Sequence, residues 1–156
     1  MKPEIGSEAP AFLAPVIGGT YQEETQIELS EFVGQRLVLV FYPKDNTPGC
    51  TTQGCAIRDD WSQLNGKAQV FGVSIDSIKS HQKFIEKQQL PYALISDEGK
   101  QIVEAYGVWV EKQMYGKTYM GTERSTFVIG VDGKIEAILE KVKPAKHLEQ
   151  LLEVLG

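Results

Sequence analysis

The sequence predicts an α/β fold with a mixed central sheet flanked by helices. Apolar runs typical of strands alternate with helical segments as far as residue 106, and the chain then finishes with two more strands and a helix. Alternation of this kind indicates parallel strand pairing, and a late hairpin adds an antiparallel pair. The 156 residues contain no internal repeat, linker or break in composition, so we expect a single domain over residues 1–156.

The N-terminal part predicts an extension placed before the main alternation. Residues 12–29 are rich in turn formers around a Gly-Gly pair, which fits a hairpin or short strands. Ser30 is expected to cap a short helical turn. Residues 36–42 form a nearly continuous apolar run stopped by Pro43, the pattern of a strand buried on both faces.

The middle of the chain predicts helices and strands in turn. Ile57, Trp61 and Leu64 follow one another at spacings of four and three, which indicates one face of a helix. The expected elements are a helix over 50–64, a strand over 69–75, a helix over 79–89, a strand over 92–96 and a short helix over 101–106.

The C-terminal part completes the fold. Residues 125–129 and 135–139 are β-rich and are separated by turn residues, so we expect a hairpin. Residues 145–155 carry four leucines on one helical face. This order of elements is the one expected of a thioredoxin-like fold with an N-terminal hairpin extension.

The charge balance and hydropathy exclude several classes of function. Lys and Arg number 16 against 21 Asp and Glu, a net charge of −5, which argues against binding to nucleic acid or anionic membranes. No apolar stretch approaches the length of a transmembrane helix, and residues 1–10 lack the apolar core of a signal peptide. We therefore expect a cytoplasmic protein, although a processed organellar product would look the same.

Cys50 and Cys55 are the two cysteines of the chain. Two cysteines do not form a zinc site by themselves, and a single short spacing is not a secreted disulfide framework. A chain of this length stabilises its core without staples. Redox chemistry and coincidence remain as the two explanations.

Cys50 is predicted to lie where a helix begins, after a buried strand and a loop. The N–H groups of a first helical turn have no internal partner and, with the helix dipole, favour a thiolate, the reactive form of cysteine. Thr47, three residues earlier, is placed for its hydroxyl to reach the sulfur or an incoming oxygen, and Pro43 and Pro48 stiffen the loop. The alternative is that Cys50 is a small buried apolar residue and that Cys55 packs in the core.

The loop sequence resembles the peroxiredoxins. Pro43-x-x-x-Thr47-x-x-Cys50 matches their active-site signature, and a second cysteine five residues later is similar to the bacterioferritin comigratory protein (peroxiredoxin Q) subfamily. The resemblance extends over nearly the whole chain. Its further segments are residues 5–12, 72–76, 96–97, 106–109 and 121–127.

The resemblance implies a thiol peroxidase for hydrogen peroxide and organic hydroperoxides that needs no bound cofactor. It implies that Cys50 is the peroxidatic cysteine, that Cys55 is the resolving cysteine of an intramolecular disulfide, and that Thr47 orients thiolate and peroxide. Pro43 would shield the sulfenate from water, and Arg124 would stabilise the thiolate and the charge on the peroxide oxygens. The implied reductant is thioredoxin, with glutaredoxin as the alternative, and the implied state is a monomer.

Other polar residues are expected to be less central. Gln53, one helical turn after Cys50, is either part of the active-site network or solvated. His81 and His147 are expected at the surface, and we assign no metal site. Residues 112–119, rich in Tyr, Met and Lys, are expected to form a mobile loop, with contact to a substrate or partner as the alternative. A thiol–disulfide oxidoreductase is disfavoured because a Cys-x-x-Cys motif is absent, and a non-enzymatic redox sensor is the remaining alternative.

The spacing of the two cysteines has a geometric consequence. Five residues along an α-helix separate two Cα atoms by about 8.7 Å. A disulfide needs Cα atoms within about 7 Å. We therefore predict that the first turn of the helix unwinds when Cys50 is oxidised, and Gly54 weakens the helix there.

Overall fold

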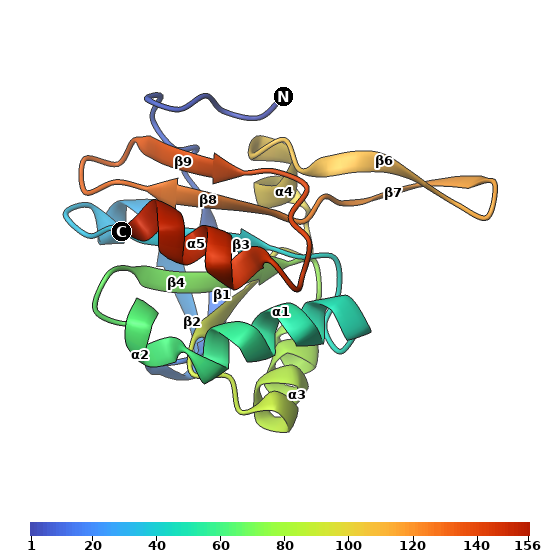
Figure 1. Ribbon diagram of the computed structural model, residues 1–156, viewed down its shortest axis with the longest axis horizontal. Helices are drawn as coiled ribbons and strands as arrows, with labels where there is room; N and C mark the ends of the chain where they lie inside the picture. Colours follow the sequence, from blue (N-terminus) through green and yellow to red (C-terminus); the bar gives the residue numbers. More distant parts are fainter.

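The computed structural model describes all residues from 1 to 156 and has a seven-stranded sheet in the order β2-β1-β5-β4-β3-β8-β9. Figure 1 shows the arrangement. The elements are β1 Leu13–Gly18, β2 Tyr21–Glu28, the 3-10 turn η1 Leu29–Phe32, β3 Leu37–Phe41, α1 Pro48–Asp59, α2 Trp61–Leu64, β4 Gln69–Ser74, α3 Ile78–Gln88, β5 Ala93–Ser96, α4 Gln101–Ala105, β6 Trp109–Met114, β7 Lys117–Thr122, β8 Ser125–Ile129, β9 Ile135–Leu139 and α5 His147–Leu155.

The main sheet is mixed, as the sequence predicts. Strands β3, β4 and β5 pair in parallel, whereas β8 runs antiparallel to β3 and β9 antiparallel to β8. The N-terminal hairpin of β1 and β2 extends this sheet, because β1 pairs antiparallel with β5. The carboxyl ends of β3, β4 and β5 therefore meet at one edge of the sheet, where open α/β sheets bind ligands.

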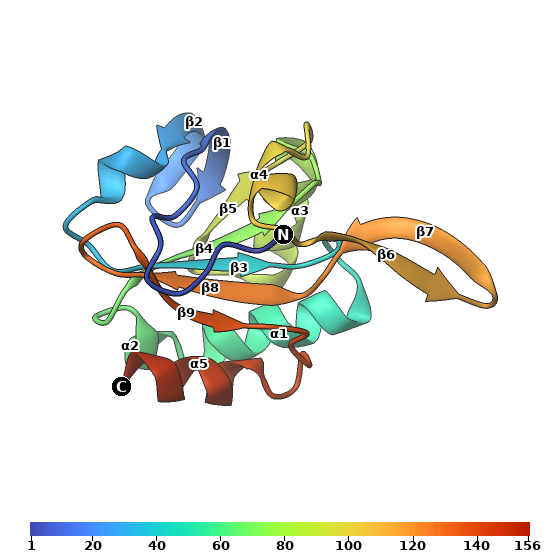
Figure 2. The same cartoon turned by 90° about the horizontal axis from the view of Figure 1, so that it is seen from above.

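Two hydrophobic cores lie on opposite faces of the sheet, and β3 supplies both. Its residues are all buried, with Leu37, Leu39 and Phe41 in one core and Val38 and Val40 in the other. Helices α1, α2 and α5 lie along one face and α4 lies beyond the other (Figure 2). The loop that follows β3 therefore begins at a fully buried strand of the sheet.

The helix expected over 50–64 differs from prediction at both ends. It begins at Pro48, because proline suits the first helical position: an N–H there would have no acceptor within the helix, so its absence costs nothing. It breaks at Asp60, whose φ of −113° and ψ of 26° leave the helical region, so that α2 is a separate short helix. None of the helices combines the length and apolar character needed to cross a membrane.

Residues 112–119, expected to be a mobile loop, belong instead to a regular two-stranded hairpin. Strands β6 and β7 pair antiparallel from Trp109 with Thr122 to Met114 with Lys117. Tyr115 and Gly116 have positive φ values of 53° and 76°, which suit a tight hairpin turn. The hairpin projects from the body of the protein (Figures 1 and 2), and its mostly exposed strands mix apolar and polar residues without the alternation that marks a strand.

Candidate active site

Cys50 lies in the first turn of α1, directly after the loop that leaves β3. Its side chain is buried, at 2% exposure. The first bond along the helix runs from the Thr51 N–H to the Thr47 carbonyl oxygen (2.9 Å), so the N–H groups of Gly49 and Cys50 precede any helical acceptor. Cys50 therefore lies in the helix turn that has free N–H groups and the positive end of the helix dipole.

Arg124, between β7 and β8, reaches across to this helix terminus. Its Nη1 donates to Cys50 Sγ at 3.4 Å and to Gln53 Oε1 at 2.6 Å. Gly49 makes room for the guanidinium, because a Cβ at that position would lie 3.0 Å from Arg124 Nη2. Of the two alternatives for Gln53, the structure therefore has the network member rather than the solvated side chain.

Thr47 and Pro43 lie on the loop before Cys50. The Thr47 hydroxyl donates to the Lys44 carbonyl oxygen at 2.8 Å, and Thr47 is the N-cap residue of α1 without a capping side-chain bond. Pro43 is half-buried just beyond β3. The structure thus gathers Cys50, Gln53 and Arg124 in direct contact, with Thr47 at the helix start beside them.

Cys55 lies further along the same helix and faces α3. Its Sγ is half-buried and donates to Gln88 Oε1 at 3.3 Å, and the Gln88 carbonyl oxygen accepts from Arg58 Nη1 at 2.6 Å. Both cysteines are free, and α1 runs unbroken through them. This is the geometry of a separated dithiol, so the predicted unwinding remains a prediction about the oxidised form.

A second cation lies at the base of the hairpin. The Lys112 Nζ donates to the Thr122 carbonyl oxygen at 2.5 Å, and its stem crosses Gly121, which lacks the side chain that would block it. Burial, together with the nearby Arg124, lowers the pKa of Lys112. Lys112 and Arg124 are thus close enough for their charges to interact on this side of the site, where Glu123 acts on Lys112 in the opposite sense.

The expectation of two surface histidines is wrong, since His81 and His147 are both fully buried. His147 Nε2 lies 2.7 Å from Thr126 Oγ1, while its Nδ1 has no hydrogen-bond partner. Burial, with the charge of Arg124, lowers the pKa of His147 to about 4. Helical spacing carried the missed signal, because His81 precedes the inward Phe84 by three residues and His147 precedes Leu151 by four.

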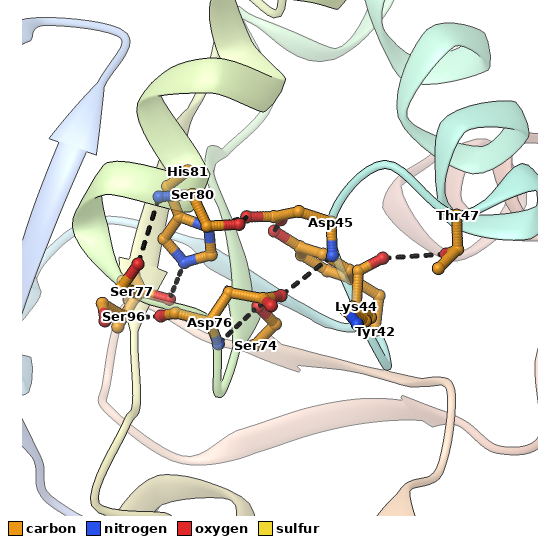
Figure 3. A network of polar contacts seen from close by, with 11 residues as sticks. Tyr42, Lys44, Asp45, Thr47, Ser74, Asp76, Ser77, Ser80, His81 and Ser96 are labelled. Atoms are coloured by element: carbon orange, nitrogen blue, oxygen red, sulfur yellow. Dashed lines mark hydrogen bonds and ion pairs between the residues drawn. The ribbon is translucent and has the colours of Figure 1, made fainter.

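Asp45 is the functional candidate that sequence reasoning missed. It lies within the Pro43–Thr47 part of the signature but is buried. Its carboxylate forms hydrogen bonds with Ser80 and His81 of helix α3 (Figure 3). A single Asp in a loop ordinarily indicates a turn, so only its burial distinguishes it.

Comparison with known proteins places this geometry in a family. The sequence model of the AhpC/TSA family matches residues 5–138. The chain belongs to the AhpC/TSA family. It is 42% identical over 153 residues to the putative peroxiredoxin bcp of Coxiella burnetii, covering 97% of this chain and 98% of the relative. It is also 42% identical to peroxiredoxin Bcp of Bacillus subtilis, covering 97% and 94%.

Solved structures agree with the sequence relatives. The bacterioferritin comigratory protein of Xanthomonas campestris superposes with a TM-score of 0.86 at 35% identity, covering 97% of both chains. Within the family, the chain is thus a peroxiredoxin of the Bcp and peroxiredoxin Q group, and its fold is thioredoxin-like, as predicted. Its activity is that of a thiol peroxidase with a peroxidatic cysteine, a hydroperoxide substrate and a thiol reductant.

Proposed function

We propose that Cys50 is the peroxidatic cysteine of this thiol peroxidase and that Cys55 resolves it. The Cys50 thiolate attacks the terminal oxygen of a hydroperoxide, the O–O bond breaks, and the leaving alkoxide or hydroxide takes up a proton. The resulting sulfenic acid is attacked by the Cys55 sulfur, which forms the disulfide and releases water. A dithiol donor then reduces the disulfide by exchange and restores both thiols.

The contact between Arg124 and Cys50 carries this assignment. A guanidinium 3.4 Å from Sγ stabilises the thiolate, and it is held in place because the same Nη1 donates to Gln53. Negative charge develops on the peroxide oxygens as the O–O bond lengthens. A fixed cation and the free N–H groups of α1 stabilise that charge without reorganising.

Thr47 is proposed to receive the peroxide and Pro43 to shield the site. The only proton of the Thr47 hydroxyl is directed at the Lys44 carbonyl oxygen, so its lone pairs remain to accept a hydrogen bond from the O–H of the substrate. Pro43 presents an apolar ring without an N–H donor beside the loop, which supports a role in keeping water from the sulfenate.

The finer identity of the substrate and partners rests on the relatives and the resemblance. The Xanthomonas relative has alkyl peroxide reduction activity, which supports organic hydroperoxides as substrates beside hydrogen peroxide. We propose thioredoxin as the dithiol donor, with glutaredoxin as the alternative. A monomer, a cytoplasmic location and a single domain over residues 1–156 are part of the same proposal.

Titration of the reduced protein with peroxide, followed by intact mass, tests the assignment. One equivalent of peroxide should remove two hydrogens from the wild type, because the oxygen leaves as water when the disulfide forms. Cys55→Ser should instead gain one oxygen at Cys50. Cys50→Ser should show neither change and should lose thioredoxin-coupled turnover.

Several outcomes would contradict the proposal. Peroxide turnover by Cys50→Ser would exclude Cys50 as the peroxidatic residue. Insulin reduction faster than peroxide turnover would favour a general thiol–disulfide oxidoreductase. Rapid oxidation of Cys50 without turnover by any dithiol donor would favour a redox sensor.

A further inference from the structure

The buried carboxylate of Asp45 is the centre of a polar network that the reaction itself does not use (Figure 3). Asp45 is 4% exposed. Its Oδ1 accepts from the Tyr42 hydroxyl at 2.6 Å. Its Oδ2 accepts from the Ser80 hydroxyl at 2.8 Å and lies 2.6 Å from His81 Nδ1. Every hydrogen bond of this carboxylate therefore comes from another buried or half-buried side chain.

His81 is held between two acceptors. Its Nδ1 faces Asp45 and its Nε2 lies 2.9 Å from the Ile95 carbonyl oxygen. A neutral imidazole has one N–H, so only the imidazolium donates to both. His81 and Asp45 thus form an ion pair, and their side chains are 0% and 1% exposed. Buried charges of this kind are tolerated only when they are paired and hydrogen-bonded, as both are here.

The network fastens the loop before Cys50 to the ends of the parallel strands. The Asp45 N–H donates to Asp76 Oδ2 at 2.9 Å, and the same oxygen accepts from the Ser74 hydroxyl at 2.6 Å. The Asp76 carbonyl oxygen accepts from the Ser96 hydroxyl. Tyr42 follows β3, Ser74 ends β4 and Ser96 ends β5. The loop is therefore held from three strand ends and from α3.

Asp45, the residue that the network fixes, is close in sequence to Thr47 and Cys50 but its side chain contacts neither of them. Asn46, the next residue, has a left-handed φ of 60°, so the backbone turns sharply just after Asp45. The carbonyl of Lys44, the residue before Asp45, accepts the Thr47 hydroxyl. Fixing Asp45 thus fixes the acceptor that orients Thr47. α1, and Cys50 in its first turn, begin directly after Thr47.

We propose that Asp45 and His81 are positioning residues that hold the loop from Pro43 to Thr47, and hence Thr47, in the geometry that peroxide attack requires. This inference rests on the proposed roles of Cys50 and Thr47. The pair acts on the placement of the peroxide rather than on the thiolate, whose stabilising partner, Arg124, lies outside the network. The loop also stays fastened when α1 unwinds, because the network includes no residue of that helix.

A metal ion is the alternative use of these side chains. Asp45, Asp76 and His81 bring possible ligand atoms within 4.8 Å of one another. Both nitrogens of His81 and the Asp76 oxygen that faces Asp45 are already engaged in hydrogen bonds. An ion would have to break those contacts, so the observations favour the ion pair.

Two reactions of Cys50 separate positioning from general damage. Reaction with hydrogen peroxide, by stopped flow, depends on Thr47 and the loop, whereas alkylation of Cys50 by iodoacetamide, measured with Cys55 replaced by serine in every protein, depends on the ionisation and exposure of the thiol but not on Thr47. His81→Leu should lower the peroxide rate constant by about 100-fold, as a misplacement of about 1 Å does. It should leave the alkylation rate within about threefold. His81→Asn, whose amide can still donate to Asp45, should recover most of the peroxide rate.

Asp97→Asn is the matched control. That buried carboxylate accepts from the Ile102 and Val103 N–H groups at the start of α4 and bonds no side chain of the network, so its loss should lower stability but leave both rates unchanged. If His81→Leu does not fold, Ser80→Ala removes one donor from Asp45 and should lower the same rate ratio by a few-fold.

The outcomes distinguish the inference from the proposed function. Equal losses of peroxide and alkylation rates, or an unchanged peroxide rate in His81→Leu and Ser80→Ala, would overturn the positioning role. Acceleration of the wild-type peroxide reaction by an added divalent cation, absent in His81→Leu, would replace it with a metal site. Equal peroxide rates for wild type and Cys50→Ser would instead overturn the proposed function.

Discussion

At the scale of single residues, the reactive sulfur depends on groups remote in sequence. Arg124 lies 74 residues from Cys50, yet one nitrogen of its guanidinium contacts both Cys50 and Gln53. Gly49 permits this approach because it has no side chain to collide with the guanidinium. The signature residues therefore do not complete the site by themselves, because the guanidinium beside the sulfur comes from the segment between β7 and β8, far along the chain.

His147 should make the stability of the protein depend on pH. Burial lowers its pKa to about 4 in the folded state, against about 6.5 when unfolded. The unfolded chain therefore binds the proton first, so this contribution is fully present above pH 6.5 and is lost as the pH falls toward 4. The loss is on the order of 3 kcal/mol.

His147→Gln is the variant that checks this expectation. A glutamine amide can replace His147 Nε2 at Thr126 and does not titrate in this range. Urea unfolding at pH 7 and pH 4.5 should show a smaller fall in unfolding free energy for the variant than for the wild type. Identical falls would show that His147 is not the titrating group, because every other ionisable side chain is common to both proteins.

At the scale of elements, α1 both builds the site and keeps its two thiols apart. Its first turn presents Cys50 to Arg124, and its next turns direct Cys55 at Gln88 on α3. Gly54 lets the helix lie against Tyr92, since a Cβ there would be 3.1 Å from the Tyr92 hydroxyl. Glycine also costs about 1 kcal/mol of helix stability relative to alanine. The same residue therefore serves close packing and easy unwinding.

Hydrogen exchange should locate the unwinding that the disulfide requires. In the reduced form, the helical bonds of α1 begin at the Thr51 N–H and protect the amides that follow. In the disulfide form, the amides of residues 51–55 should lose at least about tenfold of their protection, because local opening exposes them. The Asp45 amide, which donates to Asp76, should keep its protection.

Cys55→Ser treated with the same equivalent of peroxide is the control for that experiment. It oxidises at Cys50 but forms no internal disulfide, so its helix should stay protected. Unchanged protection of residues 51–55 in a wild-type protein that mass spectrometry shows to be fully disulfide-bonded would contradict the prediction.

At the scale of the whole molecule, the fold is stabilised without a disulfide. Two cores lie on the two faces of one sheet, and reduced Cys50 is itself a member of the core that contains Ile57 and Leu151. The core and helix α1 are therefore fully packed and hydrogen-bonded in the reduced state. Oxidation must withdraw a buried residue and break helical hydrogen bonds.

The disulfide form should accordingly melt below the reduced form. A disulfide that closes a loop of this size restricts the unfolded chain, and this stabilises the folded state by only about 2 kcal/mol. Withdrawing Cys50 and opening the first turns of α1 cost more than that, so we expect the Tm to fall by about 5 °C. Calorimetry of the reduced protein and of the protein oxidised with one equivalent of peroxide measures the difference. A higher Tm for the disulfide form would contradict it.

The sequence by itself determined the strand–helix order and the Cys50 signature. Local patterns were enough to predict these features. The burial of β3 on both faces follows from its continuous apolar run, and the helix that contains Ile57 follows from the spacing of apolar residues. The exposed hairpin of β6 and β7 was missed, since most of its residues are not buried and its apolar and polar residues therefore follow no regular alternation.

Only the tertiary structure decided which remote side chains meet at the loop. Nothing near Arg124 in the sequence indicates its contact with Gln53, and nothing near Asp45 indicates its ion pair with His81. These contacts arise because the carboxyl ends of the parallel strands and the amino end of antiparallel β8 meet at one edge, where residues from separate parts of the chain become neighbours. Local patterns indicate which face of an element is buried, but not which buried polar group will be its partner there.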